Sequence, residues 1–271
     1  MEKKFLAEKS NECRIDILQM VFNASSGHIG GAFSAIDIMT YLYFHKMNFS
    51  KENYLDNSRD RFVLSKGHAS AALYACLAHK NIFPRSELSS FRKIDSMLQG
   101  HPSRKTTPGV ETSTGSLGQG LSFANGCAIA LKMKKINAKV YCMVGDGEIN
   151  EGQFWEACMT SSRYSLDNLR VILDYNHLQI DGFIEDIKNP SPSKMRFESF
   201  GFHVIEINGH DFDEIDKAFA EADNVQGKPV FIIAHTIKGK GVSFMENNVN
   251  FHGSPPKKEE YERAMKELSD V

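Results

Sequence analysis

Short continuous apolar runs alternate with amphipathic segments along most of the chain. The clearest runs lie at 139–144, 169–176, 202–207 and 229–236, and a shorter β-prone run lies at 61–65. Continuous apolar runs are typical of strands buried on both faces, and parallel strands are usually connected by helices. The pattern therefore predicts an α/β fold, a three-layer parallel sheet with helices on both faces.

Apolar residues at helical spacing fill most of the chain between these runs. The spacing predicts helices over 3–22, 34–46, 69–80, 117–136, 153–164 and 213–223. Residues 84–115 are instead dense in Pro, Gly, Ser and Thr, and an irregular segment of that length in a compact domain usually carries function. Because no linker or repeat divides the chain, we expect one domain over 1–271, with a polar C-terminal tail from about 254.

Composition excludes several classes of protein. Lys and Arg number 32 against 34 Asp and Glu, so the chain lacks the basic footprint of a nucleic-acid binder. No apolar run approaches the roughly 20 residues of a membrane span, and the first residues lack the apolar stretch of a secretory leader. The 5 well-separated cysteines indicate reduced thiols in the core. We therefore expect a cytoplasmic protein that binds neither nucleic acid nor a membrane.

Polar residues follow two neighbouring strands of the predicted sheet. Asp146 lies between two glycines just after the run 139–144, and Asn176 ends the run 169–176. Because ligands bind beyond the carboxyl ends of parallel strands, these two side chains and a nearby carbonyl could form a hard-oxygen site for Mg²⁺ or Ca²⁺. A Mg²⁺ with so few protein ligands implies a diphosphate as the remaining ligand. The alternative is ordinary turn chemistry for both residues.

Two further segments could contact an anion or a flat ligand. Lys66 and His68 precede the helix at 69–80, and a helix N-terminus beside a cation is a ready anion site. A solvated lysine and a capping histidine are the alternative. Gly115 to Gly120 lead into the next helix and could bring backbone against a ring, although this spacing alone is a weak signal.

Four histidines lie beside a glycine in loop-like sequence: His28, His68, His101 and His252. Loops at the ends of sheets carry function disproportionately, and histidine is the usual proton-transfer residue near neutral pH. A single such histidine is more often structural, but the repeated setting favours a role in proton transfer.

Taken in order, these segments resemble signatures of the N-terminal, diphosphate-binding part of transketolases. The segments are SSGHIGG (25–31), DRFVLSKGHAS (60–70), GHP (100–102), STGSLGQGL (113–121), GDGEINEGQFWEA (145–157), LDYNHLQIDG (173–182), TIKGKG (236–241) and FHGSPP (251–256). The Gly-Asp-Gly with a later Asn is typical of thiamine diphosphate enzymes in general. The segments around His68 and Gly115 narrow the resemblance to transketolases.

The resemblance implies a role for each matching residue. Binding of Mg²⁺, which Ca²⁺ or Mn²⁺ can replace, would fall to Asp146, Asn176 and the carbonyl of Leu178. Contact with thiamine diphosphate would fall to His68, Gly115, Ser116, Leu117, Gly147 and Asn176, with positive charge from Lys66 and Lys238. The substrate and its proton transfers would fall to His28, His101 and His252, and Glu151 would join a network that links paired cofactor sites.

Two departures from the family stand out. Transketolases are typically about twice as long and carry a second, pyrimidine-binding domain, whose glutamate activates the cofactor. The sequence therefore resembles one subunit of a split transketolase, whose partner is a C-terminal, pyrimidine-binding subunit in a two-plus-two heterotetramer. The second departure is Ile29, which follows His28 where the family often has proline.

The expected function is transfer of a two-carbon ketol unit from a ketose phosphate to an aldose, only in the presence of the partner subunit. The α subunit of a 2-oxo-acid dehydrogenase is one alternative, because it also has Gly-Asp-Gly and a downstream Asn. The segments around His68 and His101 argue against it. A catalytically silent regulatory subunit is a second alternative, which the presence of Asp146 and Asn176 disfavours.

Overall fold

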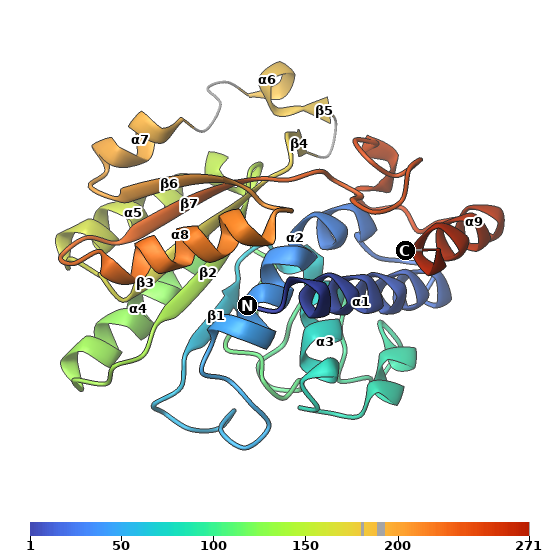
Figure 1. The fold of residues 1–271 in the computed structure, drawn as a ribbon, viewed down its shortest axis with the longest axis horizontal. Coiled ribbons are helices and arrows are strands. Elements are labelled where there is room, and N and C mark those ends of the chain that lie inside the picture. Colours follow the sequence, from blue (N-terminus) through green and yellow to red (C-terminus); the bar gives the residue numbers. More distant parts are fainter. Residues whose placement is uncertain (180–181, 189–192, 271) are drawn as a thin grey trace.

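A parallel five-stranded sheet forms the centre of the computed structural model, which describes residues 1–179, 182–188 and 193–270 (Figure 1). The sheet has the order β1-β2-β3-β7-β6. Its strands are β1 (Arg61–Leu64), β2 (Val140–Gly145), β3 (Leu169–Tyr175), β6 (His203–Asn208) and β7 (Val230–His235). Each begins and ends within two residues of its predicted run. Residues 180 and 181 of the motif at 173–182 lie outside the described residues.

Helices cover both faces of the sheet, as predicted (Figure 1). They are α1 (Lys3–Asn23), α2 (Ile29–Tyr41), α3 (Ser70–His79), α4 (Gly120–Met133), α5 (Gly152–Arg163), α6 (Ile184–Ile187), α7 (Lys194–Ser199), α8 (Phe212–Asn224) and α9 (Lys258–Ser269). Tyr141 and Met143 of β2 belong to a core shared with α1, α2, α3 and α8. Cys142 and Val144 belong to a second core, shared with α4, α5 and α7. Alternate residues of one strand thus face opposite layers.

Helix α2 begins at Ile29, earlier than the expected position 34. Gly30 and Gly31, which belong to the motif at 25–31, therefore lie inside the helix. A Cβ atom at Gly30 would lie 2.9 Å from Lys238 Cγ and 2.9 Å from the Phe251 carbonyl oxygen. Glycine therefore permits the chain to approach this helix closely.

Other differences concern short or terminal elements. The pair β4 (Leu178–Gln179) and β5 (Gly182–Phe183), together with α6 and α7, was not expected. Residues 84–115 hold no strand or α-helix, as expected, and contain one 3₁₀ turn at Arg85–Ser90. Helix α9 buries Ala264 and Leu268 and packs against α1, so one face of the expected polar tail belongs to the core.

No helix in the described part of the chain is long and apolar enough to cross a membrane. The cysteines are free thiols, and all but the half-buried Cys127 are buried, in agreement with the expected reduced state.

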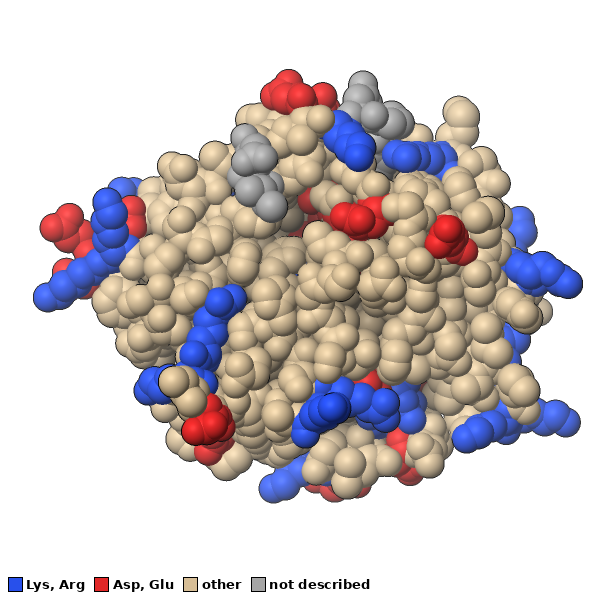
Figure 2. Space-filling view, turned by 180° about the vertical axis from the view of Figure 1, so that it is seen from behind, with Lys and Arg blue, Asp and Glu red and all other residues tan. Residues whose placement is uncertain are grey.

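Charged side chains on the face seen in Figure 2 lie mostly toward its margins, and uncharged residues form most of its centre.

Candidate active site

A cavity of about 360 Å³ lies beyond the carboxyl ends of β1, β2, β3 and β7. It collects nearly all of the residues that the sequence singled out. These are His28, Lys66, His68, His101, Gly115, Leu117, Asp146, Gly147, Glu151, Asn176, Leu178, Lys238 and His252. Ser116 is the exception, because its side chain is exposed and does not line the cavity. Parallel strands thus bring residues far apart in the sequence to one edge of the sheet.

Asp146 offers a carboxylate oxygen to this cavity. Its Oδ1 accepts a hydrogen bond of 2.8 Å from the Gly147 amide, whereas its Oδ2 is buried and has no hydrogen-bond partner. Burial, and then the nearby charge of Asp174, raise the pKa of Asp146 to about 7. A buried carboxylate oxygen without a donor fits a cation as its missing partner.

Asn176 and Leu178 supply two further oxygens. The Asn176 Nδ2 group lies 3.4 Å from Asp174 Oδ2, and Asn176 Oδ1 accepts a hydrogen bond of 3.2 Å from the Leu178 amide. His177 between them has a φ of 66°, which turns the chain so that both neighbours line the cavity. A carboxylate, an amide oxygen and a carbonyl are the hard ligands that Mg²⁺ prefers. Within the described residues no group of three His, Cys, Asp or Glu could hold a metal, so this mixed set is the candidate.

Two buried lysines place positive charge beside these oxygens. Lys66 forms an ion pair with Asp174 and donates a hydrogen bond of 3.0 Å to the Gly31 carbonyl. Lys238 donates to the Leu178 carbonyl at 3.1 Å and lies 2.7 Å from His252 Nδ1. Burial lowers the pKa of Lys238 to about 8. Because no carboxylate pairs with Lys238 in the described chain, its charge is available to an anionic ligand.

The four predicted histidines form one group around His28. Its ring centre lies 5.3 Å from that of His68, 5.5 Å from that of His252 and 6.2 Å from that of His101. Burial, together with neighbouring cations, lowers the pKa of His28 to about 4 and that of His252 to about 3. The same causes hold the pKa of His68 well below its ordinary value, and burial and Arg92 lower that of His101. All four rings are therefore neutral near pH 7, and each has one nitrogen that accepts and one that donates.

Close backbone contacts fix the loop that carries Gly115 and Leu117. A Cβ atom at Gly67 would lie 2.8 Å from the Gly115 amide nitrogen, and one at Gly115 would lie 2.9 Å from the His101 ring. Gly115 also has a φ of 143°, which side chains rarely adopt. These glycines bring the loop against the segment that holds His68.

Three lining or supporting residues escaped the sequence analysis. Glu148 is buried and accepts hydrogen bonds from the Ser65 hydroxyl and from the amides of Gly118 (2.9 Å) and Gly145 (3.0 Å), so it joins three segments. Asp174 pairs with Lys66 beneath the cavity. Gln179 lines the cavity, and its Nε2 is buried without a partner. A charged residue inside the apolar run 169–176 was a signal for Asp174, whereas nothing local marked Gln179.

A comparison with known protein families defines the class of this site. The family model of the transketolase thiamine diphosphate binding domain matches residues 7–269. The chain therefore belongs to the transketolase family, as the resemblance of its motifs indicated.

Individual relatives narrow the assignment. The chain is 40% identical over 270 residues to one of the subunits of the apulose-4-phosphate transketolase of Phocaeicola vulgatus, with 100% of this chain and 96% of that protein aligned. It is 40% identical over 263 residues to a 6-deoxy-6-sulfo-D-fructose transketolase subunit of a Clostridium species, with 97% and 96% aligned. These relatives are subunits of about the same length as this chain.

Full-length transketolases are also similar. The crystal structure of the Campylobacter jejuni enzyme superimposes with a TM-score of 0.93 at 38% identity and covers 99% of this chain. This chain spans 43% of that protein, and 42% of human transketolase, to which it is 40% identical. The parallel sheet and its helices thus have the fold of the thiamine diphosphate binding domain.

Proposed function

We propose that the chain is the diphosphate-binding subunit of a thiamine diphosphate- and Mg²⁺-dependent transketolase. It would move a two-carbon ketol unit from a ketose donor to an aldose acceptor. The observation that carries the proposal is the single cavity in which the unpartnered Oδ2 of Asp146 lies with buried lysines and four neutral histidines. A cation and a diphosphate would compensate those charges, and neutral imidazoles suit the proton exchanges of ketol transfer.

Each role is assigned to residues of this chain. Thiamine diphosphate would supply the electron sink for carbon–carbon bond cleavage. Mg²⁺, or Ca²⁺ or Mn²⁺ in its place, would be held by Asp146, Asn176 and the Leu178 carbonyl. The diphosphate would be bound by His68, Gly147 and Lys238, with Lys66 adding positive charge nearby. The cofactor rings would pack on Gly115 and Leu117, which line the cavity.

The remaining residues would act on the substrate or between sites. A neutral imidazole can accept a proton from a hydroxyl group and return it, and this role would fall to His28, His101 and His252. Glu151 is exposed at the cavity wall, where it could extend a polar network toward a neighbouring subunit.

We further propose that a separate pyrimidine-binding subunit completes the enzyme, in a two-plus-two heterotetramer. The two relatives that are named as transketolase subunits support this, because this chain aligns with 96% of the length of each. Helices α4 and α5 also present Gly126 and Gly152, beside which an added Cβ would meet open space, and the exposed Met133 and Met159. Exposed methionines are common on surfaces that bind a partner.

The donor is proposed to be a ketose with an anionic group. The names of the two subunit relatives specify a phosphorylated and a sulfonated sugar, respectively. We also propose that residues 1–271 form one domain and that the protein is cytoplasmic, as its free thiols favour.

The test mixes the purified chain with thiamine diphosphate, Mg²⁺, a ketose phosphate and an aldose, with and without the pyrimidine-binding subunit. Ketol transfer is expected only in the mixture of both subunits. A mixture containing the Asp146→Ala chain should be inactive, which shows that the partner alone does not account for the reaction. Full turnover by the chain alone would contradict the split enzyme. Release of CO₂ from pyruvate would instead support a 2-oxo-acid dehydrogenase.

A further inference from the structure

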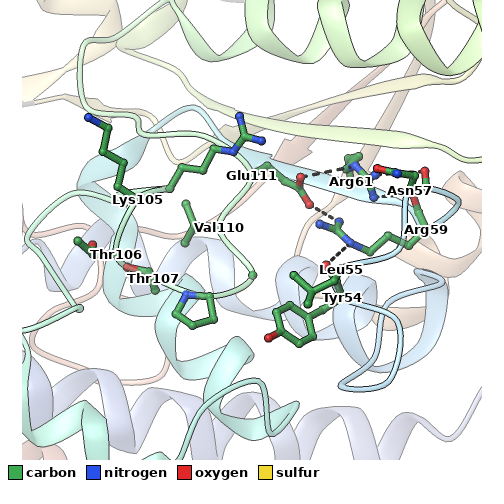
Figure 3. Close-up of a pocket in the computed structure, with 13 residues that line it drawn as sticks. Tyr54, Leu55, Asn57, Arg59, Arg61, Lys105, Thr106, Thr107, Val110 and Glu111 are labelled. Carbon is green, nitrogen blue, oxygen red and sulfur yellow. Dashed lines mark hydrogen bonds and ion pairs between the residues drawn. The ribbon is translucent and has the colours of Figure 1, made fainter.

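A second cavity, of about 460 Å³, lies near the start of β1, away from the carboxyl edge of the sheet (Figure 3). Two segments form it, residues 54–61, which end at the first residue of β1, and residues 104–111 of the long irregular stretch. Figure 3 shows Lys105 on one side of the cavity and Arg59 and Arg61 on the other, with Glu111 between them. None of these residues belongs to the candidate active site.

Positive charge exceeds negative charge among the residues that line this cavity. Four lining residues are cationic, Arg59, Arg61, Arg104 and Lys105, and Glu111 is the one carboxylate among the described lining residues. Arg59 and Arg61 both pair with Glu111. Their side chains are only 9% and 14% exposed, so the two guanidinium groups are held in place.

The other hydrogen bonds of these arginines go to neutral acceptors. Arg59 donates to the carbonyls of Tyr54 (2.6 Å) and Asp60 (2.8 Å), and Arg61 donates to those of Asp56 (3.2 Å) and Asn57 (3.1 Å). Carbonyl groups orient a guanidinium but do not neutralise it. Burial, and then the neighbouring charge of Arg59, lower the pKa of Arg61.

Arg104 and Lys105 add two charges that are not compensated. Both side chains are exposed at the edge of the cavity, and within the described chain neither pairs with a carboxylate. Val110 and, on the side of Arg59, Tyr54 add apolar surface to the lining. Two buried arginines, two exposed cations and adjoining apolar surface together match a small molecule with a doubly charged group at one end.

We propose that this cavity binds a small phosphorylated metabolite at a site separate from the candidate active site. A phosphate group carries up to two negative charges and accepts hydrogen bonds from several cations at once. It would therefore compensate the excess positive charge of the Arg and Lys side chains that line the cavity. A carboxylate-bearing metabolite would share part of this chemistry, and the experiment below distinguishes the two.

The segment that forms the cavity is also joined to the active site. A hydrogen bond of 3.3 Å from the Thr114 amide to the Pro102 carbonyl, and one of 3.1 Å from the Arg104 amide to Ser113 Oγ, close residues 102–114 into a loop. The residues on either side of this loop are His101 and Gly115, which both line the active-site cavity. A ligand that draws Arg104 and Lys105 into the cavity would move this loop, and the loop would then change the position of the adjoining His101.

The test is a calorimetric titration of the full chain with inorganic phosphate and, separately, with citrate, at low ionic strength. Phosphate is expected to bind more tightly than citrate. The Arg104→Gln/Lys105→Gln variant should bind phosphate at this cavity with a Kd that is higher by about tenfold or more. The matched control Lys134→Gln/Lys217→Gln removes two exposed cations elsewhere and should change it less than about twofold. A Lys238→Met variant identifies any phosphate bound at the active site.

A second readout follows the imidazole NMR signal of His101, assigned with a His101→Gln chain. Saturating phosphate should move this signal in the Lys238→Met chain and leave it unmoved in the Arg104→Gln/Lys105→Gln/Lys238→Met chain. Equal weakening by the control pair would overturn the proposal, because it would show only unspecific attraction of anions. Tighter binding of citrate would overturn the assignment to phosphate, and an unmoved His101 signal would overturn the connection between the two cavities.

Discussion

Lys66 and Asp174 form an ion pair in which the side chains are 1% and 0% exposed, respectively. Asp174 also accepts hydrogen bonds from Ser34 Oγ, at 2.6 Å, and from Thr236 Oγ1. These contacts hold the pKa of Asp174 below its ordinary value although burial alone would raise it. The pair connects the end of β1 with β3 beneath the candidate active site.

Lys66→Met is expected to lower the free energy of unfolding by about 3–5 kcal/mol, because it leaves the Asp174 carboxylate buried without its cation. Urea unfolding measures this loss. The exposed Lys217→Met is the control and should change stability by less than about 0.5 kcal/mol. Lys66→Met/Asp174→Leu should recover part of the loss. A change below about 1 kcal/mol for Lys66→Met would show that the pair is not needed for stability.

Asp146→Ala should abolish Mg²⁺-dependent binding of thiamine diphosphate to the assembled complex, because it removes the one anionic metal ligand. Calorimetric titration of the complex with thiamine diphosphate, with and without Mg²⁺, measures this binding. The control is His203→Ala, at a half-buried position that does not line the cavity. Unchanged affinity in Asp146→Ala would place the metal elsewhere.

The ligand-free chain should lose stability through His28 as pH falls from about 6.5 toward 4. Burial lowers the pKa of His28 to about 4, so the folded chain keeps the ring neutral while the unfolded chain takes up a proton. Urea unfolding over this pH range should show a shallower loss in His28→Gln. His203→Gln should behave like the wild-type chain. An identical pH dependence of the free energy of unfolding in the wild-type chain and in His28→Gln would show that the pKa of His28 is not lowered.

His101→Ala should lower kcat of the assembled enzyme by about 10²–10⁴, the contribution of a positioned acid–base group. The Kd of the cofactor should change by less than about tenfold, or 1.4 kcal/mol, because the ring is exposed at the cavity edge. Steady-state kinetics, cofactor titration and thermal melting on one preparation distinguish a role in acid–base catalysis from a structural role of His101. A lower melting temperature with wild-type kcat would make His101 a structural residue.

Gln179→Leu should weaken cofactor binding by about 1.5–3 kcal/mol, the contribution of a hydrogen bond to a charged group. The same change should stabilise the ligand-free chain, because the Nε2 group is buried without a partner. These opposite effects, measured by calorimetry and urea unfolding, identify a ligand-binding amide. Gln226→Leu, at an exposed position, is the control. A loss of stability with unchanged binding would mean that the side chain only fills space.

The main strands could be predicted because their signal is local. Burial on both faces makes each strand a continuous apolar run, and the helices between them follow from periodicity. The start of α2 could not be predicted from the local sequence, in which glycines usually mark the end of a helix. Here glycine is needed inside the helix because Lys238 and Phe251, which lie far along the chain, pack closely against it. The pair β4–β5 has only two residues in each strand, too few to show a period.

The site residues could be predicted where the chain approaches the end of a strand. Asp146, Asn176 and the glycine-flanked histidines follow from that rule and from the family motifs. The roles of Glu148 and Asp174 depend on partners in other segments, such as Gly118 and Lys66. Gln179 stands out only because its amide lacks a partner in three dimensions.

The cavity contains several polar atoms that the chain itself does not satisfy, among them Asp146 Oδ2, His28 Nδ1 and Gln179 Nε2. A ligand that satisfies them stabilises only the folded state, so occupied molecules resist opening more than empty ones. Proteases cut opened chains, and even a modest difference in stability changes the amount of a protein in a cell several-fold. The cellular lifetime of this subunit should therefore follow the supply of its cofactor, and molecules that stay empty should be the first to be degraded.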